Sequence, residues 1–200
     1  SSDLGSADYL LPVAKRTIEQ ARVLVGGKRA LETLAPVGVK SKVIDGDIAG
    51  VLSYIEAELT TQDVVVMVSG DPGFYSLLPA VRRRFPQECI EVIPGISSLQ
   101  LAFARTGDYW QDATLISLHG RKADETGLAY RRDKKLGILT DSENNSSTIA
   151  RQLLRAGWPA ATPAFVCLAL SYETEQVVTA TLEELSNREG YSHCVMVVKA

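Results

Sequence analysis

Two kinds of hydrophobic pattern alternate along the first half of the chain. Amphipathic segments, with apolar residues three and four positions apart, predict helices at 9–22, 28–34, 47–59, 76–85 and 97–105. Short runs rich in β-branched residues predict strands at 22–25, 42–44, 64–68 and 89–93. The run 64–68 is apolar throughout, which is typical of a strand buried on both faces of a parallel sheet. This alternation predicts an α/β domain over residues 1–110.

The second half is richer in strands. Strands are predicted at 114–118, 136–139, 163–169, 176–181 and 194–199, and helices at 146–156 and 182–187. Residues 107–113 interrupt the periodicity and mark the predicted boundary between the domains. We therefore predict a two-domain α/β fold with a mostly parallel sheet in residues 1–110, a mixed sheet in residues 111–200 and a ligand cleft between them.

Composition supports a folded globular protein and argues against several other classes. The 200 residues are 46% hydrophobic and 22% charged, which is enough apolar material for a buried core. No apolar run approaches the roughly 18 residues that a membrane span needs, and the N-terminal residues lack a secretory pattern. A net charge of −3 argues against a general nucleic-acid binder. We expect Cys89, Cys167 and Cys194 to be buried free thiols of a cytoplasmic protein, neither disulfides nor metal ligands.

Three junctions between a strand and a loop carry groups that could bind a ligand. The first is Ser69-Gly70-Asp71-Pro72-Gly73, directly after the apolar run 64–68. Gly70 and Gly73 permit close approach of a ligand to the backbone, and Asp71 could accept a hydrogen bond from a hydroxyl or an amine. In open α/β sheets, ligands gather at the carboxyl ends of strands. A tight turn in which Asp71 caps the next helix explains the same residues equally well.

The second junction, Pro94-Gly95-Ile96-Ser97-Ser98, leads from a predicted strand into a helix. Gly95 permits an unusual dihedral angle. Ser97 and Ser98 offer hydroxyls and backbone N–H groups that suit carboxylate or ribose oxygens. Taken alone, ordinary N-capping explains these serines better.

The third junction ends a predicted strand with His119-Gly120-Arg121-Lys122. His119 could accept or donate a proton near neutral pH. Arg121 and Lys122 could hold carboxylates, the arginine through two parallel hydrogen bonds. The alternative is a solvated loop that happens to contain a histidine.

Together these motifs resemble those of the S-adenosylmethionine-dependent tetrapyrrole (corrin/porphyrin) methylases. The similarity rests on Ser-Gly-Asp-Pro-Gly-Phe-Tyr followed by Ile-Pro-Gly-Ile-Ser-Ser, and on residues 5–14, which resemble the end of the family's first Gly-rich loop and its next helix. Ser-Leu-His-Gly-Arg, Gly-Ile-Leu-Thr-Asp and Leu-Ser-Tyr-Glu-Thr-Glu resemble the branch that methylates C-5 of cobalt-precorrins. The family usually begins with a strand that leads into Gly-x-Gly-Pro-Gly. Only Gly5 of that loop stands here, so we expect the first strand to be missing.

The resemblance implies S-adenosylmethionine as cofactor, with S-adenosylhomocysteine as product, and no metal site. Carried over position by position, the cofactor contacts would come from Gly70, Asp71, Gly73, Ser97, Ser98, Leu139, Thr140, Ala169 and Leu170. The substrate would be a cobalt-precorrin with several carboxylates, for which Arg121, Lys122 and the basic run 131–135 are candidate cations. His119 would accept a proton after methylation. For the arginines at 82–84 we prefer the interpretation of an exposed helix end.

The resemblance also implies a homodimer, with contact to a separate C-15 methylase/decarboxylase, and no membrane or nucleic-acid partner. Four alternatives stay open. The chain could methylate another corrin carbon (C-11, C-20 or C-2), act as a diphthine synthase, or be a non-catalytic binding protein. A Rossmann nucleotide enzyme is the weakest of them, because no Gly-x-Gly-x-x-Gly is present.

Overall fold

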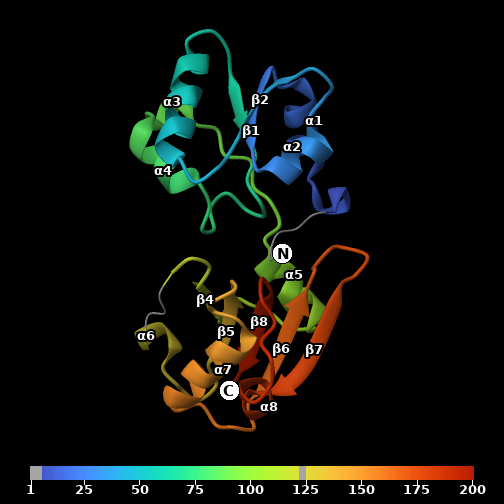
Figure 1. Ribbon diagram of the computed structural model, residues 1–200, viewed down its shortest axis with the longest axis vertical. Helices are drawn as coiled ribbons and strands as arrows, with labels where there is room; N and C mark the ends of the chain where they lie inside the picture. Colours follow the sequence, from blue (N-terminus) through green and yellow to red (C-terminus); the bar gives the residue numbers. More distant parts are fainter. Residues whose placement is uncertain (1–5, 122–124) are drawn as a thin grey trace. The chain divides into compact units, whose positions relative to one another are not determined.

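The computed structural model describes residues 6–121 and 125–200, and these divide into two compact units, residues 6–96 and residues 97–200 (Figure 1). The boundary predicted from the sequence lies later, near residue 110. Residues 97–110 belong to the second unit because the helix within them packs on the second sheet. Gly5 lies outside the described residues.

The first unit contains a parallel sheet of three strands. Its elements are the 3-10 turn η1 (Ala7–Tyr9), α1 (Pro12–Gln20), β1 (Val23–Gly26), α2 (Lys28–Leu34), β2 (Lys40–Val43), α3 (Ile48–Leu59), β3 (Val64–Val66), α4 (Leu78–Arg84) and the 3-10 turn η2 (Gln87–Cys89). The strand order is β2-β1-β3, and both pairings are parallel, as the sequence predicted. The buried central strand is β1, whereas β3 lies at one end of this order and its residues are half-buried.

Two apolar clusters cover the two faces of β1. Leu24 packs in a cluster with Ile18 of α1 and Leu31 of α2. The next residue, Val25, packs in a second cluster with Val51 of α3. Because neighbouring residues of a strand point to opposite faces, α1 and α2 cover one face of the sheet and α3 covers the other.

The prediction of a strand at 89–93 is wrong. Residues 87–89 form the 3-10 turn η2, and residues 90–96 follow it without pairing to a strand of the described chain. The backbone at Ile90 is extended, as its β-branched side chain favours, but Val92 is exposed. Propensity can predict an extended backbone, but a strand also needs a neighbour that accepts and donates its hydrogen bonds.

The second unit contains a mixed sheet of five strands. Its elements are α5 (Ser98–Arg105), β4 (Thr114–Ser117), α6 (Glu125–Leu128), β5 (Lys135–Leu139), α7 (Ser146–Arg155), β6 (Pro163–Leu168), β7 (Gln176–Thr181), α8 (Leu182–Ser186) and β8 (Val195–Lys199). The order is β4-β5-β8-β6-β7, in which β4 and β5 are parallel and the other pairs antiparallel. This confirms the predicted mixed sheet. The short helix α6 was not predicted.

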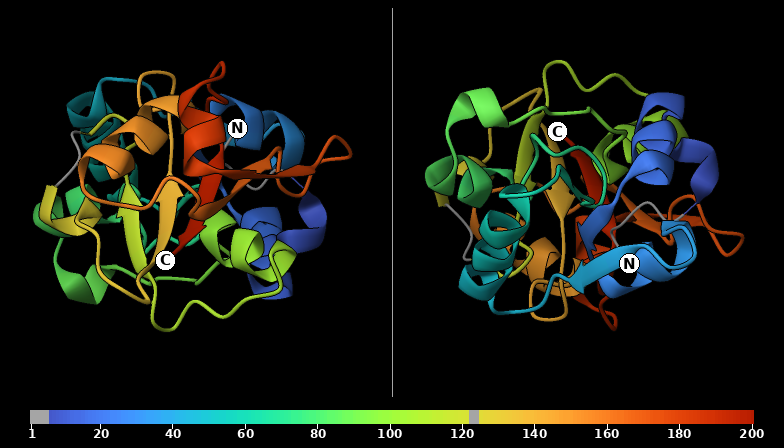
Figure 2. Two further views of the ribbon diagram at one scale, coloured as in Figure 1. Left: turned by 90° about the horizontal axis from the view of Figure 1, so that it is seen from below. Right: turned by 90° about the horizontal axis from the view of Figure 1, so that it is seen from above.

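Helices cover both faces of this sheet. Leu136 and Ile138 of β5 belong to the core that contains the apolar residues of α7 and α8. Gly137 faces α5: a Cβ at this position would lie 2.8 Å from Leu99 Cδ2 and 2.9 Å from Phe103 Cε2. Alternate residues of a strand point to opposite sides, so α7 and α8 cover one face and α5 the other (Figure 2).

The three cysteines are free, but only two are buried. Burial raises the pKa of Cys167 to about 12 and that of Cys194 to about 11. Cys89 is exposed at the end of η2, so the prediction of a buried thiol is wrong at this position, which is not in a sheet. Among the helices of the described chain, none has the length and apolar character required to cross a bilayer.

Candidate functional site

The carboxyl ends of three strands meet at one edge of the five-stranded sheet. β8 runs antiparallel to both β5 and β6, so β4, β5 and β6 all point the same way. The predicted segments therefore leave the sheet together: residues 118–121 after β4, 139–141 at the end of β5 and 169–171 after β6. Residues 193–194, which lead into β8, lie at the same edge. We call these four segments the carboxyl edge.

Thr140 connects three strands at the carboxyl edge. Its N–H donates to the Cys194 carbonyl (3.1 Å), and its Oγ1 accepts from the Cys194 N–H (2.8 Å). Its carbonyl oxygen lies 3.3 Å from Nδ1 of His119. Because a carbonyl can only accept, Nδ1 carries a proton in this arrangement, which leaves Nε2 of a neutral imidazole with a lone pair. Thr140 is fully buried, and both its backbone N–H and its carbonyl are used in these bonds.

The ring of the second histidine lies beside the first. The centroids of His119 and His193 are 5.8 Å apart, and both residues are exposed. His193 directly precedes Cys194, so the bonds between Thr140 and Cys194 also fix this segment. His193 is not predicted from the sequence, because it lies 74 positions from His119 and only the sheet order brings the two close.

Asp141 holds the turn that contains His119 and Arg121. Its Oδ2 accepts from the Gly120 N–H (2.7 Å), and its Oδ1 accepts from the N–H groups of Glu143 (2.9 Å) and Asn144 (2.6 Å). Burial alone would raise the pKa of Asp141. These backbone donors outweigh it and hold that pKa below its usual value.

Asn144 holds the same turn from its other side. Its Nδ2 donates to the carbonyl of Leu118 (2.9 Å) and to that of Arg121 (3.2 Å). The side chains of His119 and Arg121 are thus exposed on a turn whose backbone is fixed. The Gly-Ile-Leu-Thr-Asp motif contains Asp141, but this role of Asp141 and Asn144 is not predicted from the sequence. The available signal was an Asp-x-x-Asn pattern directly after a strand. Lys122 lies outside the described residues.

The turn after β6 has an uncommon backbone. Ala169 and Ser171 have φ of 46° and 71°, in the left-handed region that residues with a Cβ seldom adopt. Leu170 between them is buried. The Ser171 N–H donates to Oε2 of Glu175 (2.7 Å), which is also paired with Arg105 of α5.

The serines at the start of α5 have different surroundings. Ser97 forms a capping box: its Oγ accepts from the Gln100 N–H (3.2 Å), and Gln100 Oε1 accepts from the Ser97 N–H (2.8 Å). Ser97 therefore performs ordinary N-capping, the alternative that the sequence favoured for it. Ser98 is buried.

In the first unit, Asp71 joins the first and second motifs. Its Oδ1 accepts from the Gly73 N–H (2.7 Å) and its Oδ2 from the Gly95 N–H (3.0 Å). A Cβ at Gly95 would overlap the Gly70 carbonyl oxygen, so this position needs glycine for close approach, and the expected unusual dihedral angle is absent. Asp71 does not cap α4, whose N-cap residue is Leu77.

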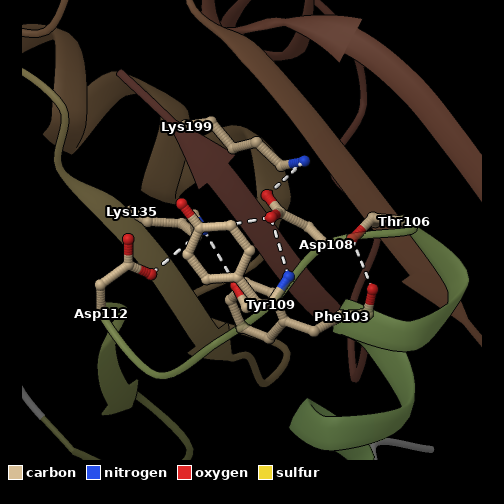
Figure 3. Close-up of polar contacts among 7 residues, drawn as sticks. All are labelled: Phe103, Thr106, Asp108, Tyr109, Asp112, Lys135 and Lys199. Carbon is tan, nitrogen blue, oxygen red and sulfur yellow. Dashed lines mark hydrogen bonds and ion pairs between the residues drawn. The ribbon is translucent and has the colours of Figure 1, made fainter.

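Two of the candidate cations in the basic run 131–135 are bound to other groups of the protein. Lys134 is buried and its Nζ donates to the carbonyls of Gly127 and Ala129, both at 2.7 Å. Lys135 is also buried, and its Nζ contacts Asp108, Asp112 and the Tyr109 carbonyl (Figure 3). Both lysines lie at the amino end of β5, opposite the carboxyl edge, so the prediction is wrong for them.

The other arginine cluster agrees with the sequence analysis. Arg82, Arg83 and Arg84 are exposed in the last turn of α4. This confirms the interpretation of an exposed helix end. Basic side chains also suit the carboxyl end of a helix, where the backbone dipole is negative.

The chain matches the family model of the Tetrapyrrole (Corrin/Porphyrin) Methylases over residues 4–186. It belongs to this family. Among the relatives of this methylase is the cobalt-precorrin-7 C(5)-methyltransferase of Salmonella typhimurium, 35% identical over 148 residues that cover 74% of the chain and 72% of that protein. A probable cobalt-precorrin-7 C(5)-methyltransferase of Methanocaldococcus jannaschii is 30% identical over 192 residues, covering 92% and 88%.

Solved structures show the same fold for this methylase. A precorrin-6Y methylase of cobalamin biosynthesis from Archaeoglobus fulgidus superimposes with a TM-score of 0.70 at 25% identity, covering 94% of this chain and 90% of that one. A uroporphyrin-III C-methyl transferase from Thermus thermophilus, complexed with S-adenosyl homocysteine, gives a TM-score of 0.73 at 22% identity, covering 97% and 87%. The family and the fold inferred from the motifs are confirmed.

Proposed function

We propose that this methylase transfers a methyl group from S-adenosylmethionine to ring carbon C-5 of a cobalt-precorrin in cobalamin biosynthesis. The observation that carries the proposal is the identity of 30–35% to proteins named as cobalt-precorrin-7 C(5)-methyltransferases, over most of their length. The fixed turn with His119 and Arg121 at the carboxyl edge supports it, because a tetrapyrrole with several carboxylates needs cations near its binding site.

The residues proposed for the cofactor fit its chemical groups. Gly70 and Gly73 leave the backbone open to close approach, and Leu139 and Ala169 offer apolar surface and backbone groups that suit an adenine. Each Asp71 oxygen retains a lone pair after its bond to a backbone N–H, which can accept from a hydroxyl or an ammonium group. We assign the cofactor contacts to Gly70, Asp71, Gly73, Ser97, Ser98, Leu139, Thr140, Ala169 and Leu170.

The chemistry asks little of the side chains besides alignment and one proton transfer. When bound, S-adenosylmethionine supplies a methyl group already activated by its sulfonium. The methylated ring carbon gains a C–C bond as the C–S bond breaks, and it then loses a proton. Nε2 of His119 has the lone pair to accept that proton, since Nδ1 donates to Thr140. Arg121 binds a substrate carboxylate.

Two measurements test the function. Calorimetry of the whole chain should detect binding of S-adenosylhomocysteine. Incubation with S-adenosylmethionine and the cobalt-precorrin that lacks the C-5 methyl should add one methyl mass, and NMR should locate it at C-5. Absence of binding would refute an S-adenosylmethionine-dependent reaction. Methylation of precorrins only at C-11, C-20 or C-2 would refute the choice of carbon.

We also propose a homodimer that works in the cytoplasm and contacts a separate C-15 methylase/decarboxylase. The exposed free thiol of Cys89 supports a reducing compartment, where such groups persist. Analytical ultracentrifugation should give twice the chain mass of 21.7 kDa. A single species of the chain mass at micromolar concentration would contradict the dimer.

A further inference from the structure

The turn after β6 is held in a conformation that its residues do not favour. Ala169 and Ser171 both have a Cβ, and both lie in the left-handed region. Such residues persist only where the surrounding structure fixes them, and they concentrate at binding sites. This turn contains Ala169 and Leu170, which we assign to the cofactor.

The carboxylate of Glu175 holds the end of this turn. Oε2 of Glu175 accepts the Ser171 N–H at 2.7 Å. The turn is also closed by backbone bonds from Tyr172 N–H to the Ala169 carbonyl (3.0 Å) and from Glu175 N–H to the Tyr172 carbonyl (2.9 Å). Glu175 is therefore both a part of the loop and the side-chain acceptor of the Ser171 amide.

Arg105, the last residue of α5, orients that carboxylate. Its Nε donates to Oε1 of Glu175, and its second guanidinium nitrogen lies 3.5 Å from Oε2. The hydrogen bond from Arg105 holds the pKa of Glu175 below its usual value, against the effect of burial. Because α5 is packed against β5 at Gly137, the arginine extends from a fixed helix.

We propose that Arg105 and Glu175 are positioning residues that keep Ala169 and Ser171 in the left-handed conformation in which this turn binds S-adenosylmethionine. The proposal rests on the proposed function. Without the carboxylate, the turn relaxes toward more common backbone angles. The cofactor then binds less tightly, because part of its binding energy must rebuild the turn.

If this proposal is correct, replacing Arg105 or Glu175 should weaken cofactor binding while changing the stability of the protein little. The side chains of Arg105 and Glu175 are 37% and 20% exposed. Ion pairs with such access to water contribute little to folding. A merely structural pair would change the melting temperature and affinity together or change neither.

The experiment measures S-adenosylhomocysteine affinity by calorimetry and amide exchange in the cofactor-free protein. Glu175→Ala should weaken binding by about tenfold, with faster exchange at the Ser171 amide. Glu175→Gln keeps an acceptor for that amide and should lose roughly threefold. Arg105→Gln leaves Glu175 in place, and its loss of affinity should fall between those of the two Glu175 variants. Glu173→Ala, on the same loop and exposed, is the matched control and should bind like the parent chain.

A second substitution tests the backbone directly. Glycine adopts positive φ without a steric cost, so Ser171→Gly added to Glu175→Ala should recover part of the lost affinity. A structural role elsewhere in the protein would not be rescued at this position.

The outcomes distinguish the two proposals. Unchanged affinity in Glu175→Ala, with binding by the parent chain, would overturn the positioning role alone. Failure of the parent chain to bind would overturn the proposed function and the cofactor part of this inference. Unchanged exchange at Ser171 in Glu175→Ala would show that the carboxylate does not hold the turn. If Glu175→Ala does not fold, Glu175→Gln and Arg105→Gln decide by the same two measurements.

Discussion

Two aspartates in the separate units of this methylase have the same role. Asp71 accepts hydrogen bonds from the backbone N–H groups of Gly73 and Gly95. Asp141 accepts them from the N–H groups of Gly120, Glu143 and Asn144. A carboxylate can accept several hydrogen bonds at once, so one side chain can join two loops. At both places the joined loops contain residues assigned to ligand binding.

Asp71 should matter more to the cofactor than to folding. Asp71→Ala removes the acceptor and releases the Gly95 loop, so we expect about tenfold weaker S-adenosylhomocysteine binding, or ~1.4 kcal/mol. Asp63→Ala, an exposed aspartate before β3, serves as the control. Calorimetry and thermal melts of both variants check this. Equal affinity in Asp71→Ala would remove the residue from the cofactor site.

Arg121 should affect the substrate alone. Loss of a charge-assisted pair with a carboxylate should raise KM for the cobalt-precorrin by roughly tenfold in Arg121→Ala, with S-adenosylhomocysteine affinity unchanged. Arg83→Ala is the matched control, because Arg83 is also exposed but lies at the end of α4. Steady-state kinetics measures the effect, and an unchanged KM would leave Arg121 as a surface charge.

At the scale of elements, the periodicity of the sequence predicted most of the helices and strands. The helix at 28–34 and the strand at 176–181 have the predicted bounds, because each has a regular apolar pattern that one neighbouring layer buries. The strand at 89–93 failed because its pairing depends on other segments. The helix α5 was predicted correctly but assigned to the first domain, since nothing local shows which sheet it covers.

Gly137 determines how closely α5 approaches its sheet. Gly137→Ala places a methyl group within 3.0 Å of Leu99, Phe103 and Leu115, in a buried layer. Overpacking of this kind should destabilise the protein by about 1–3 kcal/mol. Urea unfolding measures the effect. Gly46→Ala, where a Cβ also meets nothing within 4 Å, is the control and should change the free energy of unfolding little.

For the whole molecule, the cluster in Figure 3 connects the residues after α5 to the sheet. Lys135 contacts Asp108 and Asp112, its Nζ lies 3.7 Å from the Tyr109 ring centroid, and Lys199 lies 2.6 Å from Asp108. The hydrogen bond from Lys199, with smaller contributions from Lys135 and the Tyr109 N–H, keeps the pKa of Asp108 below its usual value despite burial. This cluster should make stability depend on pH.

The direction of this pH dependence follows from the lowered pKa of Asp108. Its contribution is complete above the unfolded value of roughly 3.9 and is lost as the pH falls toward the folded value. Asp108→Asn should lose about 1–3 kcal/mol at neutral pH and flatten the decline below roughly pH 4. Asp112→Asn, whose side chain is 48% exposed, should lose less. Urea unfolding across pH checks both, and an unaltered acid decline would contradict the assignment.

The reactivity of the three thiols tests which cysteines are buried in each unit. In the native protein Cys89 should react with a thiol reagent at neutral pH, while Cys167 and Cys194 stay protected by burial and by pKa values of about 12 and about 11. Unfolding in urea should expose all three. Mass spectrometry counts the labels, and rapid native labelling of three thiols would contradict the buried positions.

The sequence by itself determined the alternation of helices and strands, the mixed character of the second sheet and the family. These follow from local periodicity and from motifs that lie within short stretches. Only the tertiary structure decided which charges are available. It buried Lys134 and Lys135 at the far end of β5, paired Arg105 with Glu175, and brought His193 beside His119. The reason is physical: hydrogen-bond and ion-pair partners far apart in the chain meet only through strand order, which local patterns do not encode.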